Sequence, residues 1–421
     1  MAKSFERLQP IDTASHAIDV QIEGRRVSSI RPTAEQGISD GPPARLVFPG
    51  FVNAHTHLPM VLFRGLADDV PLQVWLEQYV WPLEKRLTPE DVYWCTLLAI
   101  AEGVRSGTTA FVDMYFHCDE IAHAVEESGV RALLSYGMIA PSLDDGGADE
   151  LAKTRSLVKR WNGRADGRIR VAVAPHSVYT CGEDVWRESI ELARSFDVPI
   201  HTHLAETRRE VDDWKERVGA SPVHSLDRLG AFSVPTVAAH CVHVDEADIE
   251  TLARGSAIVA HCPKSNAKLG SGVAPVAAMQ RAGVRVGLGT DGAASNNRLD
   301  MLEELRAAWL VQRAHVEDAA SITSADVVKM AIEPARPLLG LPAHGLVAGA
   351  PADLVLMKTE GPHTTPAHDA PAMMAYASQS ADVTDVYIDG KPLLECGELR
   401  TIDEERVISE VRRLLHRIKN R

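Results

Sequence analysis

The sequence is poor in cysteine and has none of the spacings that make cysteines cross-links or metal clips. Its six cysteines are scattered along 421 residues, and no two of them form a Cys-x-x-Cys pair. This spacing argues against a disulfide framework and favours reduced thiols, most of them small core residues, in a cytoplasmic protein. The six are Cys95, Cys118, Cys181, Cys241, Cys262 and Cys396.

Other absences exclude further classes of protein. No apolar run approaches the ~18 residues of a membrane span, and residues 1–6 lack the apolar core of a secretion signal. Lys and Arg total 44 against 58 Asp and Glu, so the net charge is −14, and there is no long basic run. We therefore expect neither nucleic acid nor an anionic membrane as a partner, and expect a small-molecule substrate instead.

What is present is a repeated alternation of short apolar runs and helix-period segments between about residues 46 and 316. Eight such units match the size of a (β/α)₈ barrel. A doubly wound open sheet is the alternative, but no glycine-rich phosphate-binding motif follows the first run. The expected strands are 46–52, 108–112, 131–136, 169–174, 199–204, 236–239, 257–260 and 284–288, and the clearest helices are 89–105, 119–128, 149–161, 183–196, 245–254 and 273–282.

The two ends of the chain differ from this core. Residues 20–27 predict a strand-turn-strand, and Asp389-Gly390 between two apolar runs predicts a hairpin. We expect 1–48 and 346–400 to form one small β-sandwich domain around a barrel of residues 49–345. Apolar residues at helical spacing predict a packing helix within 401–421.

Polar side chains stand where the predicted barrel strands end. In an extended strand, residues two apart share a face, so His55 and His57 can offer two imidazoles to one point. Alone, this pair is a weak signal of metal binding, and two histidines with structural hydrogen bonds are the alternative. Later strands also end in polar residues, and the carboxyl ends of barrel strands form the active face, which predicts a functional cluster. The later residues are His176, His203, His240, His261 and Asp291.

These motifs resemble those of the amidohydrolase superfamily over essentially the full chain, and most closely its aminohydrolase branch, the 5′-methylthioadenosine/S-adenosylhomocysteine deaminases. The matching segments are 49–57, 113–115, 174–177, 203–207, 239–243 and 288–297. The resemblance implies that one divalent metal, usually zinc and in some relatives iron, is bound by His55, His57, His203 and Asp291. It also makes a homo-oligomer the expected assembly.

The chemistry of such a site can be argued from the residues. Hydrolytic removal of an amine from an aromatic ring needs hydroxide at neutral pH, and a bound divalent cation lowers the pKa of water from about 15.7 to about 7. Glu206 can carry a proton to the ring nitrogen and the departing amine. Asp291 can accept the proton of the attacking water, and His240 can hydrogen-bond the attacking oxygen and the developing tetrahedral centre.

Several histidines have competing interpretations. His201 shares a strand face with His203 and could be the ligand by periodicity, but Glu206 and the family pattern favour His203, with His201 a layer deeper. His176 replaces the bridging lysine or acid of dinuclear relatives, which favours a mononuclear site with His176 as a substrate contact. His261 could be a hydrogen-bonding neighbour of the site or purely structural, whereas His117 and His243 are interpreted as structural.

The resemblance also suggests substrate contacts. Trp75 and Glu84 stand at family positions that meet the ribose, and Ser295 matches a contact near the metal; a helix anchor and a solvated charge are the alternatives for the first two. The two positions that carry arginines for the homocysteine carboxylate hold Tyr136 and Ala148 here. A buried carboxylate without a cationic partner is costly.

We therefore expect a metal-dependent hydrolytic deaminase that accepts 5′-methylthioadenosine or adenosine better than S-adenosylhomocysteine and gives the inosine-type product. The alternative in the same superfamily is an aminohydrolase or chlorohydrolase of another heteroaromatic, such as an s-triazine, a pterin or an oxidised guanine. A scaffold protein without activity is a third possibility, but it would have no need of the complete ligand set with Glu206 and His240.

Overall fold

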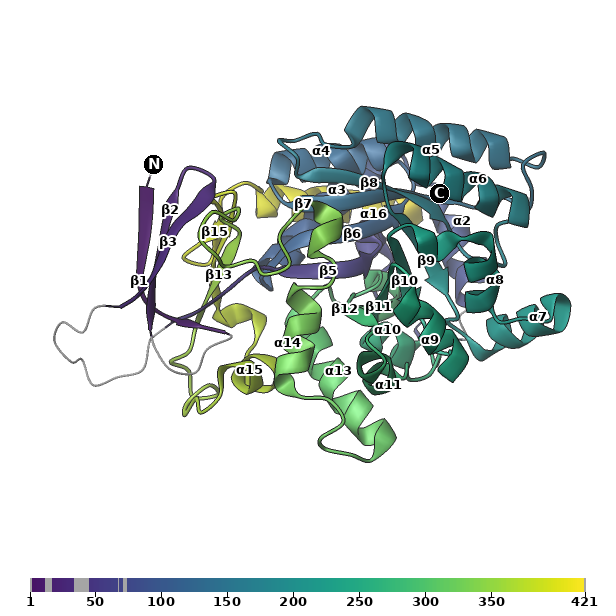
Figure 1. Cartoon of the computed structure of the whole chain (residues 1–421). Coiled ribbons are helices and arrows are strands. Elements are labelled where there is room, and N and C mark those ends of the chain that lie inside the picture. The colour runs from purple at the N-terminus through teal and green to yellow at the C-terminus, as the bar shows by residue number, and fades with distance from the viewer. Residues whose placement is uncertain (1, 12–16, 34–44, 67, 71–73, 420–421) are drawn as a thin grey trace.

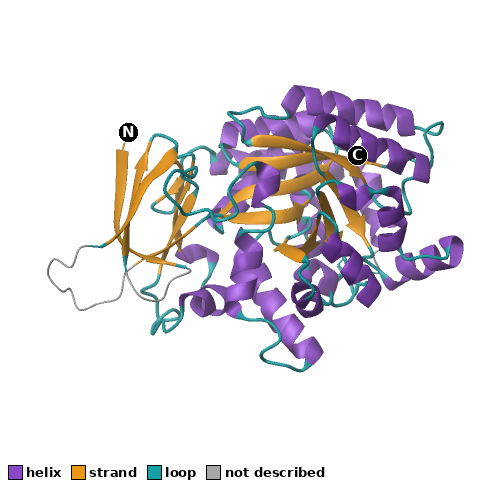
Figure 2. Ribbon diagram, viewed as in Figure 1, coloured by secondary structure: helices purple, strands orange, loops and turns teal. Residues whose placement is uncertain are grey.

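The computed structural model describes residues 2–11, 17–33, 45–66, 68–70 and 74–419. It contains two β-sheets, one of which is surrounded by helices (Figure 1). Figure 2 shows the second sheet at one side of the molecule, next to the end of the helix-covered sheet.

The larger sheet is the predicted parallel (β/α)₈ barrel. Its eight strands follow one another in chain order, so that each pairs with the next. This order excludes the doubly wound alternative, in which the strand order reverses within the sheet. The strands are β5 (Phe51–Thr56), β6 (Thr108–Tyr115), β7 (Arg131–Met138), β8 (Ile169–Pro175), β9 (Ile200–Leu204), β10 (Thr236–His240), β11 (Ala257–His261) and β12 (Arg285–Leu288).

Polar contacts bring the first and last barrel strands together. The backbone N–H of Asp291 donates to the carbonyl of His55 at 3.0 Å. The Asn53 side chain donates to Thr290 Oγ1 at 2.7 Å and accepts from the Thr290 N–H at 3.0 Å. Residues that follow β12 are thereby fixed beside the end of β5, although the two strands lie at opposite ends of the barrel sequence.

Helices connect the strands and cover the barrel (Figure 2). Thr88 caps α3, with Pro89 in the first turn and a reciprocal capping box to Asp91. The helices of the barrel region are α2 (Trp81–Glu84), α3 (Pro89–Arg105), α4 (Cys118–Ser128), α5 (Gly147–Trp161), α6 (Glu183–Phe196), α7 (Arg208–Val218), α8 (Pro222–Leu229), α9 (Glu246–Arg254), α10 (Pro263–Lys268), α11 (Val276–Arg281), α12 (Ala293–Asn296), α13 (Met301–Val316) and α14 (Ser324–Ile332). Shorter helical turns lie at Leu58–Phe63, Trp75–Val80, Ala231–Ser233, Arg336–Leu339, Met373–Ala377 and Ser380–Asp382.

One predicted strand was wrong in its extent. The apolar run 46–52 is divided between the two sheets: β4 (Arg45–Phe48) belongs to the terminal sheet, and β5 begins the barrel at Phe51. Pro49 and Gly50 interrupt the run, and a Cβ at Gly50 would lie only 2.0 Å from Thr109 Cγ2. His55 consequently lies inside the first barrel strand, and His57 follows directly after it.

The second sheet is built from both ends of the chain. Its strand order is β16-β15-β14-β13-β4-β1-β2-β3. In a flat sheet β14 and β1, three places apart, would be separated by about 14 Å, yet the rings of Phe5 and Tyr387 lie 5.3 Å apart. The sheet therefore folds over a core of its own. Its strands are β1 (Ala2–Pro10), β2 (Ile18–Glu23), β3 (Arg26–Pro32), β4 (Arg45–Phe48), β13 (Leu354–Lys358), β14 (Val383–Ile388), β15 (Lys391–Glu395) and β16 (Glu398–Leu399).

Both predicted features of the C-terminal region are present in the described residues. Asp389 and Gly390 form the turn between β14 and β15, each with positive φ (50° and 72°), as such a hairpin requires. The final helix, α16 (Glu404–Lys419), lies against α3, where Arg105 makes two hydrogen bonds to Glu404 at 2.9 and 2.6 Å. A further short helix is α15 (Ala370–Ala372).

The cysteine and membrane predictions can also be compared with the structure. All six cysteines are free thiols, and five of them are buried, whereas Cys396 is exposed. Within the described residues, none of the helices combines the length and the apolar character needed to span a bilayer.

Candidate active site

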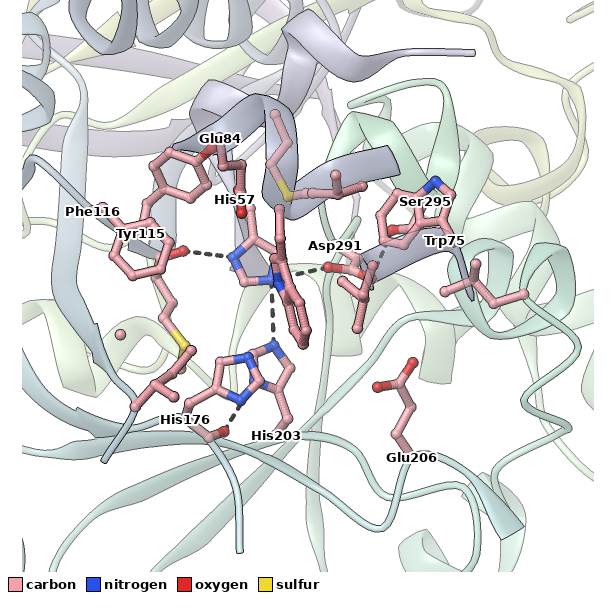
Figure 3. Close-up of a pocket in the computed structure, with 18 of the residues that line it drawn as sticks. His57, Trp75, Glu84, Tyr115, Phe116, His176, His203, Glu206, Asp291 and Ser295 are labelled. Carbon is pink, nitrogen blue, oxygen red and sulfur yellow. Dashed lines mark hydrogen bonds and ion pairs between the residues drawn. The ribbon is translucent and has the colours of Figure 1, made fainter. Parts of the chain in front are cut away.

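A cavity opens at the carboxyl ends of the barrel strands (Figure 3). This is the face on which barrel enzymes carry their active sites. The lining mixes aromatic and aliphatic side chains with histidines and carboxylates. They are His57, Met60, Trp75, Leu76, Val80, Trp81, Glu84, Met114, Tyr115, Phe116, Gly137, Ile139, His176, Tyr179, His203, Glu206, His240, Leu269, Asp291 and Ser295.

The four residues that the resemblance implies as metal ligands come together at the floor of this cavity. His57 Nε2 lies 3.3 Å from His203 Nε2 and 3.3 Å from Asp291 Oδ1. His55 Nε2 lies 3.5 Å from the same carboxylate oxygen. Figure 3 shows His57, His203 and Asp291 pointing toward one another. Four side chains from β5, β9 and the loop after β12 thus face one point.

Hydrogen bonds on the far side of two rings set their tautomers. His57 Nδ1 lies 2.5 Å from the carbonyl oxygen of Met114, and His203 Nδ1 lies 3.0 Å from that of His176. A carbonyl oxygen only accepts, so each Nδ1 carries a proton, and in the neutral ring that a metal ion requires each Nε2 keeps its lone pair. Holding the outer ring nitrogen in this way is what metal-binding histidines require.

These residues fit a divalent metal ion. His55 Nε2 is buried and has no hydrogen-bond partner, although a polar atom in that position normally needs one. Ligand atoms of His55, His57 and Asp291 all lie within 4.8 Å of one another, as do those of His55, His203 and His240. Imidazole nitrogens with one carboxylate oxygen form a donor set that suits zinc and neighbouring transition metals.

The electrostatics of the cluster favour a positive charge at its centre. Burial lowers the pKa of His55 to about 4, and burial holds the pKa of His203 well below its usual range. Burial also lowers the pKa of His57, but the hydrogen bond and charge of Asp291 outweigh it and raise that pKa to about 9. The Asp291 carboxylate therefore attracts a cation, either a proton or a metal ion, to the point between these rings.

Glu206 and His240 lie beside this cluster. Glu206 follows β9 and is almost fully buried, and burial raises the pKa of its carboxyl group. Its Oε2 lies 3.8 Å from His240 Nε2. A carboxyl group with a raised pKa next to an imidazole is suited to take up and release a proton.

Three residues that support the site escaped the sequence analysis. Ser265 Oγ donates to Asp291 Oδ2 at 2.6 Å, and the neighbouring Asn266 lies with its Oδ1 2.9 Å from His240 Nδ1. The Glu210 carboxylate accepts from the backbone N–H of Glu206 at 2.8 Å. The available signal was a pair of polar residues, Ser265 and Asn266, in the first turns of the helix that begins at Cys262-Pro263 after the end of β11.

Most of the predicted substrate contacts line the cavity, as Trp75, Glu84, His176 and Ser295 do. Trp75 is held by a hydrogen bond from its Nε1 to the Leu66 carbonyl at 3.1 Å. Burial raises the pKa of Glu84, which lies near Tyr115. Ser295 Oγ donates to Asp291 Oδ2 at 2.8 Å, so its hydroxyl is already engaged by the predicted metal ligand.

Tyr136 and Ala148 are not among the described residues that line the cavity. The Tyr136 hydroxyl donates to Glu150 on α5 at 3.2 Å, on the outer side of β7. The next strand residue, Gly137, faces the cavity instead. The predicted roles of Tyr136 and Ala148 in substrate selection therefore stay predictions.

The remaining histidines lie outside the cavity lining. His261 is buried at the end of β11, where burial lowers its pKa to about 3, and its Nδ1 has no hydrogen-bond partner. His243 Nε2 lies 2.7 Å from the Ser271 carbonyl oxygen, and His117 precedes α4 with a φ of 52°. His201 lies beneath His55, with its Nε2 2.8 Å from His55 Nδ1.

Sequence and structure comparisons both find similar proteins that are named as deaminases. A curated relative from Pelotomaculum thermopropionicum, named 5-methylthioadenosine/S-adenosylhomocysteine deaminase, is 44% identical over 96% of this chain and 94% of its own. A 5′-deoxyadenosine deaminase from Methanothermobacter thermautotrophicus is 44% identical over 92% of both chains. The crystal structure of an adenosine deaminase from Xanthomonas campestris with bound zinc superposes with a TM-score of 0.90, at 37% identity, over 96% of this chain and 94% of that one.

The sequence profile of the amidohydrolase family matches residues 46–393, which include the whole barrel and part of the terminal sheet. With relatives of 44% identity over nearly the full length, the match is not confined to the metal-binding motifs. The chain belongs to the amidohydrolase family.

Proposed function

We propose that this protein is a metal-dependent hydrolytic deaminase of an adenine nucleoside, which releases ammonia and leaves the inosine-type product. The observation that carries the proposal is that His55, His57, His203 and Asp291 meet at one point beside the buried acid Glu206. The names of the relatives, which include two nucleoside deaminases at 44% identity, support the same chemistry. Of the substrates, 5′-methylthioadenosine or adenosine is favoured over S-adenosylhomocysteine.

In this proposal His55, His57, His203 and Asp291 hold one divalent ion, and zinc is the favoured metal. Such an ion supplies a nucleophile from water at neutral pH and stabilises negative charge on the attacked ring. The zinc in the Xanthomonas campestris structure supports this choice of metal. Neutral histidines with free Nε2 lone pairs are what the hydrogen bonds of His57 and His203 favour.

The catalytic groups move protons in this scheme. Glu206 carries one proton of the attacking water to the ring nitrogen next to the attacked carbon, and then carries the second proton, which Asp291 accepts from the same oxygen, to the departing amine. Its raised pKa supports this role, because a buried carboxyl group is protonated more readily than an exposed one. Asp291 accepts a proton from the attacking water. His240 hydrogen-bonds the attacking oxygen, with its ring fixed by Asn266 at Nδ1.

The rest of the cavity holds the nucleoside. Trp75 forms a wall for the sugar, Glu84 accepts hydrogen bonds from its hydroxyls, and His176 contacts the base. Ser295 is kept in the proposal as a contact near the metal. Among the described lining residues there is no lysine or arginine, which favours a neutral nucleoside. The homo-oligomeric state and the cytoplasmic location stay predictions.

The test is ammonia release from 5′-methylthioadenosine and adenosine by the zinc-loaded protein, with the 6-oxo product identified by mass. Glu206→Gln should lower kcat by about 10²–10⁴-fold, the usual contribution of a general acid or base, without loss of bound zinc. Glu216→Gln makes the same change at an exposed position on α7 and should leave kcat unchanged. Full activity in Glu206→Gln would contradict the proposed role.

A further inference from the structure

A chain of buried hydrogen bonds runs beneath the metal-binding cluster. His55 Nδ1 lies 2.8 Å from His201 Nε2, and His201 Nδ1 lies 3.0 Å from Ser135 Oγ. Ser135 Oγ in turn donates to the backbone carbonyl of Asp113 at 2.7 Å. The chain links four barrel strands, β5, β9, β7 and β6. We call these three side chains, His55, His201 and Ser135, the relay.

The backbone carbonyl of Asp113, which accepts the last hydrogen bond, fixes which atom donates and which accepts in each hydrogen bond of the relay. A carbonyl oxygen cannot donate, so the single hydroxyl proton of Ser135 goes to Asp113. Ser135 Oγ then accepts from His201 Nδ1–H. A neutral His201 has no second proton, so its Nε2 accepts from His55 Nδ1–H. His55 Nε2 is left with a lone pair, and it is this atom that faces Asp291 at 3.5 Å.

His55 differs in this respect from the other two predicted ligand histidines. His57 and His203 give their Nδ1 protons to backbone carbonyls, which every sequence provides. His55 gives its proton to a side chain, so its tautomer depends on the residue at position 201. His55, His201 and Ser135 are all 0% exposed. Bulk water therefore cannot take over a hydrogen bond that is lost there.

We propose that His201 is a positioning residue that fixes the tautomer and the ring orientation of His55 and thereby sets the affinity of the site for its divalent metal. The proposal rests on the metal site of the proposed function. His201 itself is not a ligand, because both of its ring nitrogens are engaged within the relay. Partners of this kind commonly account for about 10–100-fold in metal affinity.

Two amide substitutions separate this role from mere filling of the barrel. In His201→Gln, the side-chain oxygen can occupy the place of Nε2 and accept from His55. In His201→Asn, the shorter side chain places its amide near the position of Nδ1, where it reaches Ser135 but not His55. Both variants remove the imidazole and bury an amide, and they differ in which neighbour that amide can reach, His55 for Gln and Ser135 for Asn.

The experiment measures the zinc dissociation constants of the purified full-length protein and its variants by competition with a chelator of known affinity. Thermal unfolding of each variant in excess chelator reports whether the barrel is folded. We expect His201→Asn to bind zinc about 10–100-fold more weakly than the natural protein, and His201→Gln to recover most of that loss. The deaminase activity of His201→Asn should recover when the zinc concentration is raised in proportion to its higher dissociation constant.

Ser135→Ala provides a milder version of the same test if the His201 variants fold poorly. It keeps the imidazole but removes the group that orients it, so a smaller loss of zinc affinity is expected. Equal zinc affinity in the natural protein, His201→Asn and Ser135→Ala would overturn the role of His201 while leaving the metal site intact. A natural protein that binds no zinc would instead overturn the proposed function on which this role rests.

Discussion

A nucleoside with a carboxylate on its 5′ substituent should be a poor substrate for this protein. Three carboxylates, Glu84, Glu206 and Asp291, line the cavity, and no described lining residue is a lysine or an arginine. A substrate carboxylate that enters the cavity therefore loses water without gaining a cationic partner. Neutral nucleosides such as 5′-methylthioadenosine and adenosine do not incur this cost.

The size of the effect follows from the missing hydrogen bonds. A hydrogen bond to a charged group contributes about 1.5–3 kcal/mol, and about 1.4 kcal/mol corresponds to a factor of ten. The absence of one such bond in the transition state lowers kcat/KM by roughly 10–150-fold. The assay is a comparison of kcat/KM for 5′-methylthioadenosine, adenosine and S-adenosylhomocysteine with the same zinc-loaded preparation.

A single substitution should shift this preference. Ile139 lines the cavity and is 43% exposed, so a longer side chain at this position has room to reach the solvent side. Ile139→Arg should raise kcat/KM for S-adenosylhomocysteine relative to the two neutral nucleosides, and Ile139→Gln serves as the uncharged control. A natural protein that already prefers S-adenosylhomocysteine would refute the reasoning, as would equal effects of Arg and Gln on all three substrates.

Three further predictions concern the metal site and stability. Gly289→Ala should weaken zinc binding, because its Cβ would lie 2.8–3.0 Å from backbone atoms and the Cβ of His55; chelator competition measures this, and unchanged affinity would contradict it. Asp291→Asn should lower zinc affinity and abolish ammonia release together, whereas retained zinc would argue against Asp291 as a ligand. Burial raises the pKa of Glu304 from its ordinary 4.5 to about 8, so the stability that its neutral form contributes is full below pH 4.5 and is lost as the pH rises through about 8. Glu304→Gln should therefore reduce the fall in Tm between pH 5 and pH 9, and an unchanged fall would contradict this assignment.

The barrel could be predicted because its strands are buried on both faces. Strands of this kind read as unbroken apolar runs, and seven of the eight runs coincide with β6 to β12 within a few residues. The first run was predicted as one strand because residues 46–48 and 51–52 are all apolar, although Pro49-Gly50 marks the break between β4 and β5. The helix α7 was not predicted, because only Val211 among its residues is buried and its apolar pattern is correspondingly weak.

Some residues of the candidate site could likewise be predicted from the sequence, and others could not. The strand ends of the barrel predicted a functional cluster that includes His55, His57, His203 and Asp291, and the resemblance to the amidohydrolase superfamily singled out these four as metal ligands. Ser265 and Asn266 were not, because their partners lie on other strands, and no local pattern tells which side chain an exposed-looking serine will reach. The alternation along β7, which turns Gly137 toward the cavity and Tyr136 toward α5, likewise depends on a register that the sequence leaves open.

The central claim is that this chain removes ammonia from an adenine nucleoside with the help of a bound divalent metal. The most direct measurement follows ammonia and nucleoside together in samples that differ only in metal content. We predict one ammonia and one 6-oxopurine nucleoside for each 5′-methylthioadenosine or adenosine consumed, loss of both after chelation, and recovery of both when zinc is restored. A zinc-loaded protein that leaves these nucleosides intact, or that turns them over equally well after the metal is removed, would contradict the claim.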